Sequence, residues 1–259
     1  NQLRKHPQVC LSSPKEVHFF NTEKYDFGLS WYLKHFKCQP NQIKGEFDAG
    51  YYLSDQAAKR IKKDLKNPKL IVCLRNPIER AFSNFTSVNS FEKKYSSFEE
   101  ALEKDPQLLQ RGLYFKQLKK YFDLFPQDNF LILFYEDIGK DPIGFMNKVF
   151  NFLKVGKKND LPDANQKINQ SKTYRLPALK RIIGRLIRWL RKGKTRNQIA
   201  QIIASLGGRH LINFLEKINS KEDQEKEMKP ATRERLRKYY AQDIKELEKL
   251  LNKDLSFWK

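Results

Sequence analysis

The sequence predicts an α/β domain with a central parallel sheet flanked by helices and a helical C-terminal part. Two short apolar runs, residues 69–74 and 129–134, have the length and composition of buried strands. Segments with helical spacing of apolar residues precede and follow each run. This alternation of helix and strand is typical of parallel strands that are joined by crossover helices.

Local signals place the ends of several helices. Ser54 is a suitable N-cap for a helix through Lys63, and Pro77 suits the first position of the helix that follows the first strand. The helix that precedes the second strand ends before Pro126. The spacing of apolar residues predicts further helices over 29–36, 113–125, 142–153, 179–191 and 232–251, and residues 1–8 have the character of a helix end.

The composition is that of a globular protein with a strong excess of positive charge. The 259 residues are 39% hydrophobic, which is too apolar for a disordered chain, and the net charge is +21. No stretch of about 20 apolar residues and no secretory signal is visible. The charge predicts attraction to polyanions, but much of the excess is Lys on expected helix surfaces, so charge alone selects no partner.

The three cysteines, Cys10, Cys38 and Cys73, show neither a metal-ligand spacing nor an even disulfide framework. Cys73 falls inside an apolar strand, where a buried free thiol is expected. These features favour a reducing compartment.

The turn after the first strand has the elements of an anion site. The strand delivers Arg75 to its carboxyl end, where ligands bind in open α/β sheets. A helix that begins near Pro77 offers free N–H groups, and Ser83 lies two turns into it. The arginine fork suits phosphate oxygens. An ordinary surface pair between Arg75 and Glu79 explains the same residues equally well.

The pair Glu16 and His18 is another candidate site. A carboxylate followed two residues later by an imidazole, on the same side of an extended chain, suits removal of a proton from a hydroxyl group. Taken alone, such a pair is common, and a single histidine among aromatic residues is more often packed than catalytic.

Both segments resemble the sulfotransferases that use 3′-phosphoadenylyl sulfate (PAPS). The run Arg-Asn-Pro-x-Glu-Arg-x-x-Ser-x-Phe over 75–85 is similar to their 3′-phosphate motif. The run Pro-Lys-Glu-Val-His-Phe-Phe over 14–20, continued by Tyr25, Gly28 and Trp31-Tyr32, is similar to their catalytic segment. The resemblance is strongest to the heparan sulfate branch and its bacterial relatives.

The resemblance implies a P-loop-like three-layer fold and a sulfotransferase that takes PAPS as co-substrate and needs no metal. The acceptor would be a hydroxyl group on a glycan, including an anionic glycan, or on another alcohol. Arg75 and Ser83 would hold the 3′-phosphate, and Glu79 and Arg80 would support the turn. Glu16 would be the general base, with His18 assisting it or positioning the acceptor.

The match runs nearly end to end, as one sulfotransferase domain over 1–259. The segments 112–118, 125–137 and 230–258 resemble framework parts of the family. Family members carry a Gly-rich 5′-phosphosulfate loop after their first strand, and the chain is expected to lack that strand and loop and hence to be inactive as given. The run 191–194 resembles a family phosphate loop but stands too early for a role to be assigned.

The loop 45–51 resembles a family loop, often Glu-Lys-Ser/Thr-Pro-x-Tyr, that lies beside the acceptor. Phe47 stands where many glycan-modifying relatives have Lys, and Ala49-Gly50 replaces the usual Pro-x pair. These departures put a heparan-like substrate in doubt.

Other readings of the sequence stay open. Residues 164–215 contain no acidic residue, and the helix expected over 179–191 has a basic face that would contact an anionic acceptor or a membrane surface, or simply face solvent. A P-loop kinase would need a Walker-type loop and an acidic Mg²⁺ site. A non-enzymatic module that binds acidic polysaccharide or another polyanion is the main alternative, and nucleic acid is not an expected partner.

The bacterial relatives are cytoplasmic, whereas the animal relatives work in the Golgi lumen. The chain shows no cysteine pair near its C-terminus. A bacterial-type cytoplasmic protein is therefore predicted, with the Golgi lumen as the alternative.

Overall fold

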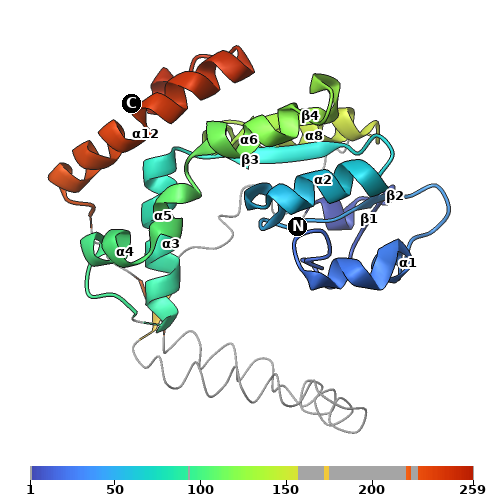
Figure 1. Ribbon diagram of the computed structural model, residues 1–259, viewed down its shortest axis with the longest axis horizontal. Helices are drawn as coiled ribbons and strands as arrows, with labels where there is room; N and C mark the ends of the chain where they lie inside the picture. Colours follow the sequence, from blue (N-terminus) through green and yellow to red (C-terminus); the bar gives the residue numbers. More distant parts are fainter. Residues whose placement is uncertain (1, 93, 157–171, 175–219, 223–226, 259) are drawn as a thin grey trace, which may run out of the picture. The chain divides into compact units, whose positions relative to one another are not determined.

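The computed structural model describes residues 2–92, 94–156, 172–174, 220–222 and 227–258 (Figure 1). The chain forms two compact units. The first contains residues 1–80, 110–166 and 235–259, and the second contains residues 81–109 and 167–234. No helix within the described parts is long and apolar enough to cross a membrane. The basic helix expected over 179–191, and the run 191–194, lie outside the described residues.

The first unit contains most of the regular structure. Its strands are β1 (Val9–Leu11), β2 (Ile43–Gly45), β3 (Leu70–Leu74) and β4 (Phe130–Phe134). Its helices include α1 (Gly28–Leu33), α2 (Asp55–Asp64), α6 (Tyr114–Phe122), α7 (Tyr135–Ile138) and α8 (Pro142–Leu153), with the 3₁₀ turns η1 (Leu3–Lys5), η2 (Glu23–Phe27), η3 (Tyr51–Leu53), η4 (Gln127–Asn129) and η6 (Ser256–Trp258). Two long helices, α3 (Pro77–Glu92) and α12 (Pro230–Leu251), have residues in both units.

The strands of the first unit form two parallel pairs. β1 pairs with β2, with Val9 opposite Ile43, and β3 pairs with β4, with Leu70 opposite Phe130. α8 packs along β4 (Figure 1). The parallel arrangement with helical crossovers confirms the predicted α/β class. The described strands differ from the expected single central sheet in that they form two separate pairs.

Most of the predicted helix ends are confirmed. Ser54 caps α2 by accepting a hydrogen bond from the backbone N–H of Ala57 at 3.1 Å. α8 begins at Pro142, directly after Asp141, whose side chain accepts from the N–H of Gly144. The helix end expected at residues 1–8 is only the short turn η1.

An aromatic core fixes the segment that contains Glu16 and His18. Phe19 and Phe20 are fully buried and contact the ring of Tyr32, with centroids 4.8 and 5.1 Å away. Apolar residues of α2 and α6 complete this cluster, namely Ala57, Ala58, Ile61, Tyr121 and Phe125. Burial of this much aromatic surface stabilises the position of the chain on both sides of His18.

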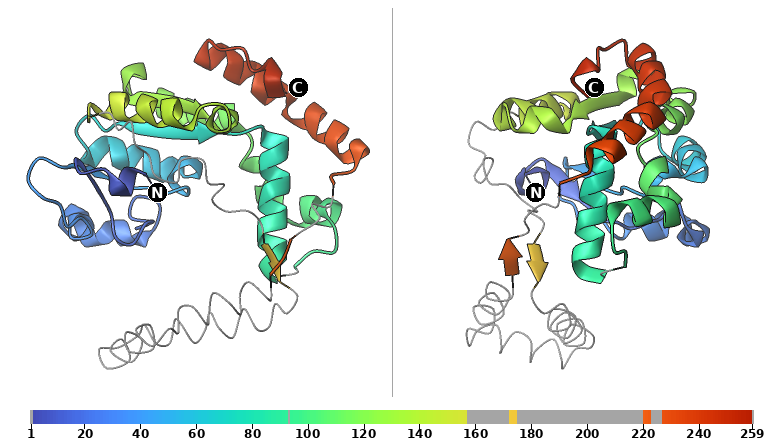
Figure 2. Two further views of the ribbon diagram at one scale, coloured as in Figure 1. Left: turned by 180° about the vertical axis from the view of Figure 1, so that it is seen from behind. Right: turned by 90° about the vertical axis from the view of Figure 1, so that its left-hand side faces the viewer.

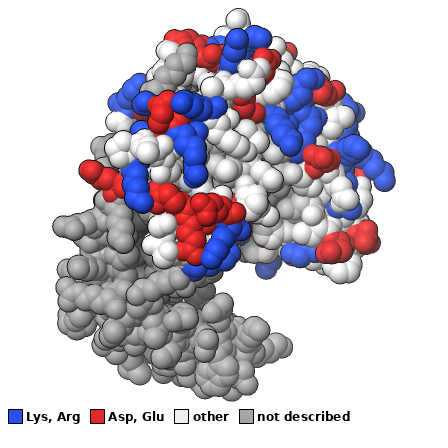
Figure 3. Space-filling model, turned by 60° about the vertical axis from the view of Figure 1, so that its left-hand side comes forward, with Lys and Arg blue, Asp and Glu red and all other residues white. Residues whose placement is uncertain are grey.

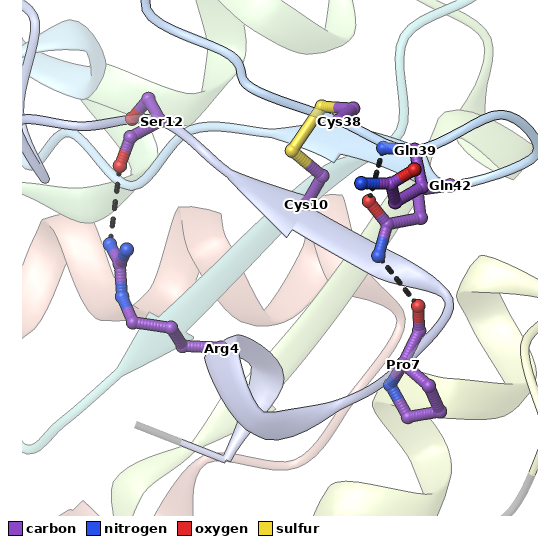
Figure 4. Close-up of a disulfide and its surroundings, with 7 residues drawn as sticks. All are labelled: Arg4, Pro7, Cys10, Ser12, Cys38, Gln39 and Gln42. Carbon is purple, nitrogen blue, oxygen red and sulfur yellow. Dashed lines mark hydrogen bonds between the residues drawn. A yellow bond between two sulfur atoms is a disulfide. The ribbon is translucent and has the colours of Figure 1, made fainter.

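The expectation that the cysteines form no disulfide is wrong for Cys10 and Cys38. Cys10 and Cys38 form a disulfide that joins β1 to the segment before β2 (Figure 4). A nearby bond reinforces this connection, because Gln42 donates to the carbonyl of Pro7 at 2.7 Å, while Arg4 holds the end of β1 by donating to the carbonyl of Ser12 at 3.2 Å. Sequence spacing does not predict the pairing, because the two residues are 28 positions apart and the β1–β2 pairing near them is a long-range contact.

Cys73 was expected to be buried and is exposed instead. Along β3, Ile71 and Cys73 are exposed, whereas Leu70, Val72 and Leu74 are partly or fully covered. Successive strand residues point to opposite faces, so β3 has one covered face and one accessible face. An uninterrupted apolar run does not distinguish this arrangement from burial on both faces.

We expect removal of the disulfide to lower the free energy of unfolding substantially. For the loop between Cys10 and Cys38, the chain-entropy model gives a loss of about 3–4 kcal/mol. Urea unfolding of a variant with both cysteines replaced by serine measures this loss. The matched control is Cys73→Ser, which should change stability little. Equal stability of the double variant and the parent protein would contradict the prediction.

The second unit includes the later part of α3, α4 (Phe98–Lys104), most of α5 (Pro106–Gln110) and the antiparallel pair β5 (Lys172–Tyr174) and β6 (Ser220–Glu222) (Figure 2). Phe82, Phe85 and Phe98 pack against one another, with centroids 5.1–6.2 Å apart. Glu99 accepts a hydrogen bond from the Thr232 hydroxyl at 2.6 Å, which ties the start of α12 to α4.

Positive and negative side chains both occur, close together, on the described part of the face in Figure 3. Ion pairs on helix surfaces include Lys104 with Glu100 at 2.7 Å and Lys120 with Asp55 at 2.8 Å. Exposed pairs of this kind contribute little to stability. On this face, the described residues show no uniform basic surface that would by itself identify a polyanion partner.

Candidate functional site

The first candidate site lies on an irregular segment between β1 and η2. The chain was expected to be extended here, and that expectation is wrong, because His18 has a positive φ of 59°. The turn nevertheless brings the two predicted side chains together, with Nε2 of His18 3.7 Å from Oε2 of Glu16. Both are accessible, with side-chain exposures of 41% and 36%. A non-glycine residue with positive φ is uncommon and must be held by its surroundings.

Residues 46–51, here called the anchoring loop, hold three successive backbone amides of this segment. Glu46 accepts from the N–H of Val17 at 2.7 Å, and Asp48 accepts from that of His18 at 3.1 Å. The Tyr51 hydroxyl accepts from the N–H of Phe19 at 3.1 Å. Side chains thus satisfy the backbone donors that a sheet partner would otherwise satisfy.

Glu46 is the buried centre of the anchoring loop. Its Oε2 accepts from the hydroxyls of Tyr51 at 2.7 Å and Tyr32 at 2.9 Å, while Oε1 takes the Val17 amide. Burial raises the pKa of Glu46 above its usual range, and the hydrogen bonds from Tyr51, Val17 and Tyr32 oppose that shift. Burial likewise raises the pKa of Tyr32 and Tyr51, so both remain hydrogen-bond donors.

The carbonyl groups of the same segment are also bound by side chains. The Lys24 ammonium donates to the carbonyl of Val17 at 2.7 Å, and the Thr22 hydroxyl donates to that of His18 at 2.5 Å. Arg60 on α2 donates to the carbonyls of Phe20 and Thr22 at 3.1 and 3.0 Å. Donors and acceptors on both sides therefore hold an otherwise unusual backbone in one conformation.

His18 lies between two carboxylates. Its Nδ1 is 2.9 Å from Oδ2 of Asp48, whose side chain is fully buried, and its Nε2 faces Glu16. Asp48 was not predicted as a site residue. A carboxylate, an imidazole and a second, accessible carboxylate in this order can take up a proton from a hydroxyl group placed beside Glu16.

The second candidate site begins where β3 ends. Arg75 follows the strand directly, as predicted, and the Tyr114 hydroxyl donates to its carbonyl at 2.8 Å. Its guanidinium lies 4.8 Å from the ring centroid of Tyr135, which follows β4 and is half exposed. The carboxyl ends of two neighbouring parallel strands thus present a stacked, partly accessible guanidinium.

The start of α3 differs from the prediction of free N–H groups. The side-chain Oδ1 of Asn76 accepts from the amides of Ile78 at 2.9 Å and Glu79 at 3.4 Å, and Pro77 has no N–H to offer. Asn76 is therefore the N-cap of the helix. The donors expected for an anion are already used, so any phosphate contact here depends on side chains.

The C-terminal segment holds the same turn in place. Asn76 donates through Nδ2 to the carbonyl of Trp258 at 2.9 Å, and through its backbone N–H to Glu136 at 2.7 Å. Trp258 is buried and donates from its indole nitrogen to Glu136 at 3.2 Å. The segments 125–137 and 230–258, which were interpreted as framework, thus include residues that fix the position of Arg75.

The remaining predicted residues lie on α3. Arg80 is associated with Tyr240 of α12 through a side-chain hydrogen bond, and its expected support of the turn stays a prediction. Ser83 lies in the second turn of α3, and its carbonyl accepts from the Thr86 hydroxyl at 3.0 Å. Arg75 belongs to the first compact unit and Ser83 to the second. Across the described residues, no three or more His, Cys, Asp or Glu side chains converge on a position that would hold a metal ion.

Comparison with known proteins places the chain in one family of group-transfer proteins. The family model described as sulfotransferase domain matches residues 3–249. Heparan sulfate glucosamine 3-O-sulfotransferase 3B1 of Mus musculus is 31% identical over 232 residues, covering 85% of this chain and 57% of the relative. The 3A1 protein of Homo sapiens is 32% identical over 192 residues, covering 70% of this chain and 46% of the relative. The chain belongs to the sulfotransferase domain family.

The fold is shared with a solved bacterial protein. The sulfotransferase from Alicyclobacillus acidocaldarius superposes with a TM-score of 0.68 over 99% of this chain and 91% of its own, at 22% identity. This likeness concerns the fold alone. The chain spans about half the length of the curated relatives that it matches.

Sequence reasoning missed the residues that hold the candidate catalytic pair. The anchoring loop was recognised only as a segment beside the acceptor, and nothing in its spacing predicts that Asp48 reaches His18 across 30 positions. The role of Asn76 could have been predicted from the sequence, because Asn is favoured at the N-cap of a helix and Pro at its first position.

Proposed function

We propose that the protein transfers a sulfuryl group from PAPS to the hydroxyl group of an acceptor. Membership of the sulfotransferase family supports this class of reaction. The observation that carries the proposal is the accessible Glu16–His18 pair, held by the anchoring loop at three successive amides. The function rests on this pair because transfer requires an acceptor hydroxyl to lose its proton at a fixed position.

Glu16 is the proposed general base. As the acceptor oxygen bonds to sulfur, its proton passes to a carboxylate oxygen of Glu16, and the adjacent imidazole of His18 shares the hydrogen bonding around that proton. PAPS supplies the sulfuryl group, and 3′-phosphoadenosine 5′-phosphate is the product that leaves. The exposure of Glu16 admits the acceptor, while hydrogen bonds to Val17 and Phe20 hold the backbone that follows Glu16.

The residues around Arg75 fit a nucleotide phosphate. A guanidinium is always charged and offers paired donors to phosphate oxygens. Here its backbone is fixed by Tyr114 and its side chain is oriented by Tyr135. We propose that Arg75 holds the 3′-phosphate, with Asn76 shaping the turn rather than binding the anion. The contact expected from the Ser83 hydroxyl stays a prediction.

The surface beside Glu16 favours an acceptor with an apolar side. Phe47 is 57% exposed between the two inward-pointing carboxylates of the anchoring loop. The Lys15 ammonium lies 4.3 Å from its ring centroid and 4.0 Å from Glu16. We propose that the acceptor is a glycan or another alcohol, a C–H face of which stacks on the ring of Phe47. The ammonium group of Lys15 would then bind an anionic substituent of the acceptor.

The compartment in which the protein works stays a prediction. The expectation of a reducing compartment drew on the absence of an even disulfide framework, and the Cys10–Cys38 disulfide removes that premise. The cytoplasmic assignment drew on the bacterial relatives and on the lack of a cysteine pair near the C-terminus, and it stays a prediction. Disulfides persist mainly in oxidising compartments.

The nucleotide part of the proposal is tested by ligand-induced thermal stabilisation. At about 100 times its Kd, 3′-phosphoadenosine 5′-phosphate should raise Tm by roughly 5–10 °C, because binding stabilises the folded state by about 2.7 kcal/mol. Adenosine 5′-phosphate, which lacks the 3′-phosphate, should raise it far less. The protein in its natural length is then assayed for transfer of labelled sulfate from PAPS to glycan and simple alcohol acceptors.

A non-enzymatic polyanion-binding protein would behave differently in both experiments. It would bind polyanions with a steep dependence on salt, would not distinguish the two nucleotides, and would transfer no sulfate. That combination of results would replace the proposed function.

A further inference from the structure

We propose that Asp48 is a positioning residue that fixes the tautomer of His18, and that this keeps Glu16 available as a base. The inference rests on the proposed function for its catalytic meaning. Its structural content is independent of that function, because it concerns which ring nitrogen of His18 carries the proton.

The carboxylate of Asp48 is fully buried and is surrounded by donors. Its Oδ2 accepts from the backbone N–H of His18 at 3.1 Å and lies 2.9 Å from the ring Nδ1 of the same residue. Its Oδ1 accepts from the N–H of Gly50 at 2.7 Å. A carboxylate has only acceptors, so the ring nitrogen that faces it must carry a hydrogen. In the neutral imidazole, Nε2 is then the unprotonated nitrogen.

One oxygen of Asp48 therefore binds both the backbone and the ring of His18. This double contact accounts for the persistence of the positive φ at His18, because the amide and the imidazole are directed at the same atom. The close approach also depends on Gly50. A Cβ at that position would lie 2.5 Å from the side chain of Asn21 and 3.1 Å from Asp48.

The position of the hydrogen on the His18 ring affects how strong a base the carboxylate of Glu16 is. Nε2 of His18 lies 3.7 Å from Oε2 of Glu16, which is too long for a hydrogen bond and leaves space for a hydroxyl group that contacts both atoms. If Nε2 carried the hydrogen, its N–H would face the carboxylate of Glu16, would favour the charged form and would make Glu16 a weaker base. With the hydrogen on Nδ1, the hydroxyl proton meets two acceptors and no competing donor.

The proton balance of the step is simple. The proton leaves the acceptor oxygen for Glu16 as that oxygen bonds to sulfur, and it can then be shared with the free Nε2. The resulting imidazolium would lie between the carboxylates of Glu16 and Asp48. Asp48 itself takes up no proton and does not touch the acceptor, as expected for a residue that orients a histidine.

The first test is nuclear magnetic resonance of the ¹⁵N-histidine-labelled protein, at a pH where the imidazole is neutral. The signals of His18 are identified among those of the four histidines by comparison with the spectrum of His18→Gln. We expect the shifts of His18 to report hydrogen on Nδ1 in the unaltered protein. In Asp48→Asn, whose amide can donate to Nδ1, we expect the hydrogen to move to Nε2. Hydrogen on Nε2 in the unaltered protein would overturn the proposal without need of any variant.

The second test is kinetic and uses the protein in its natural length. Asp48→Asn should lower kcat by roughly 10- to 100-fold, which is typical for loss of a carboxylate that orients a histidine, with KM for the acceptor changed by less than about twofold. Asp48→Glu, which restores a carboxylate, should recover part of both kcat and the Nδ1 tautomer. Asp26→Asn makes the same chemical change at an exposed position on η2 and should leave kcat unaltered.

The outcomes separate the two proposals. If Asp48→Asn leaves both the tautomer and kcat unaltered, the role of Asp48 is wrong although the protein is a sulfotransferase. If the unaltered protein transfers no sulfate, the proposed function fails, while the tautomer measurement still decides whether Asp48 orients His18.

Discussion

Replacement of Glu16 by Gln is expected to lower kcat for sulfuryl transfer by about a hundredfold or more. A general base contributes roughly 10²–10⁴ to rate, and the amide of Gln cannot accept the hydroxyl proton. The side chain keeps its size and is partly exposed, so we expect no loss of folding. Steady-state kinetics with PAPS and an accepted alcohol measure the effect, while circular dichroism checks the fold.

The matched control for this experiment is Glu23→Gln. Glu23 is exposed on η2 and undergoes the same chemical change, so its variant should retain the full rate. A rate for Glu16→Gln within about tenfold of the parent would show that another group removes the proton. The unprotonated Nε2 of His18 would then be the first candidate, because it lies 3.7 Å from Glu16 and is equally accessible.

The parts of the fold that the sequence predicts well are those determined by local interactions. The cap at Ser54, the start of α8 at Pro142 and the helix that follows Pro77 depend on a few neighbouring residues. The parallel pairing of β3 with β4 follows from the alternation of strand and helix. Such features need no knowledge of which distant segments meet.

The parts that could not be predicted depend on long-range contacts. The disulfide joins residues 28 positions apart through the short strands β1 and β2, which have three residues each and almost no sequence signal. The accessible face of β3 and the contact between Asp48 and His18 are likewise set by tertiary packing. Pattern reasoning and the family resemblance singled out Glu16 and His18, which are close in sequence and lie side by side, and missed the loop that holds them.

The anchoring loop shows how an irregular segment can hold a reactive pair without regular secondary structure. Glu46 and Asp48 point inward and bind successive amides, so Phe47 between them is directed to the surface beside Glu16. The same alternation that fixes the backbone of the pair therefore places an exposed side chain where we propose that the acceptor binds. If that proposal holds, a change of residue at position 47 is expected to alter acceptor preference without disturbing the proposed base.

Binding of the nucleotide should depend strongly on Arg75. Replacement by Ala removes a guanidinium that can form two charge-assisted hydrogen bonds, together worth about 3 kcal/mol, so the Kd for 3′-phosphoadenosine 5′-phosphate should rise about a hundredfold. Arg75→Lys keeps the charge but loses the planar fork, so an intermediate Kd is expected. Isothermal titration calorimetry at fixed salt measures both.

Lys66→Ala is the matched control for charge. Lys66 is exposed before the N-terminal end of β3, whereas Arg75 follows its C-terminal end, and either alanine variant removes one positive charge. If attraction to the whole basic protein governed binding, the two variants would weaken it equally, by only a few fold, and the effect would vanish at high salt. A hundredfold loss of affinity in the Arg75 variant alone would instead require a direct contact between Arg75 and the nucleotide. Because Asn76 already occupies the first amides of α3, little backbone binding would remain to compensate.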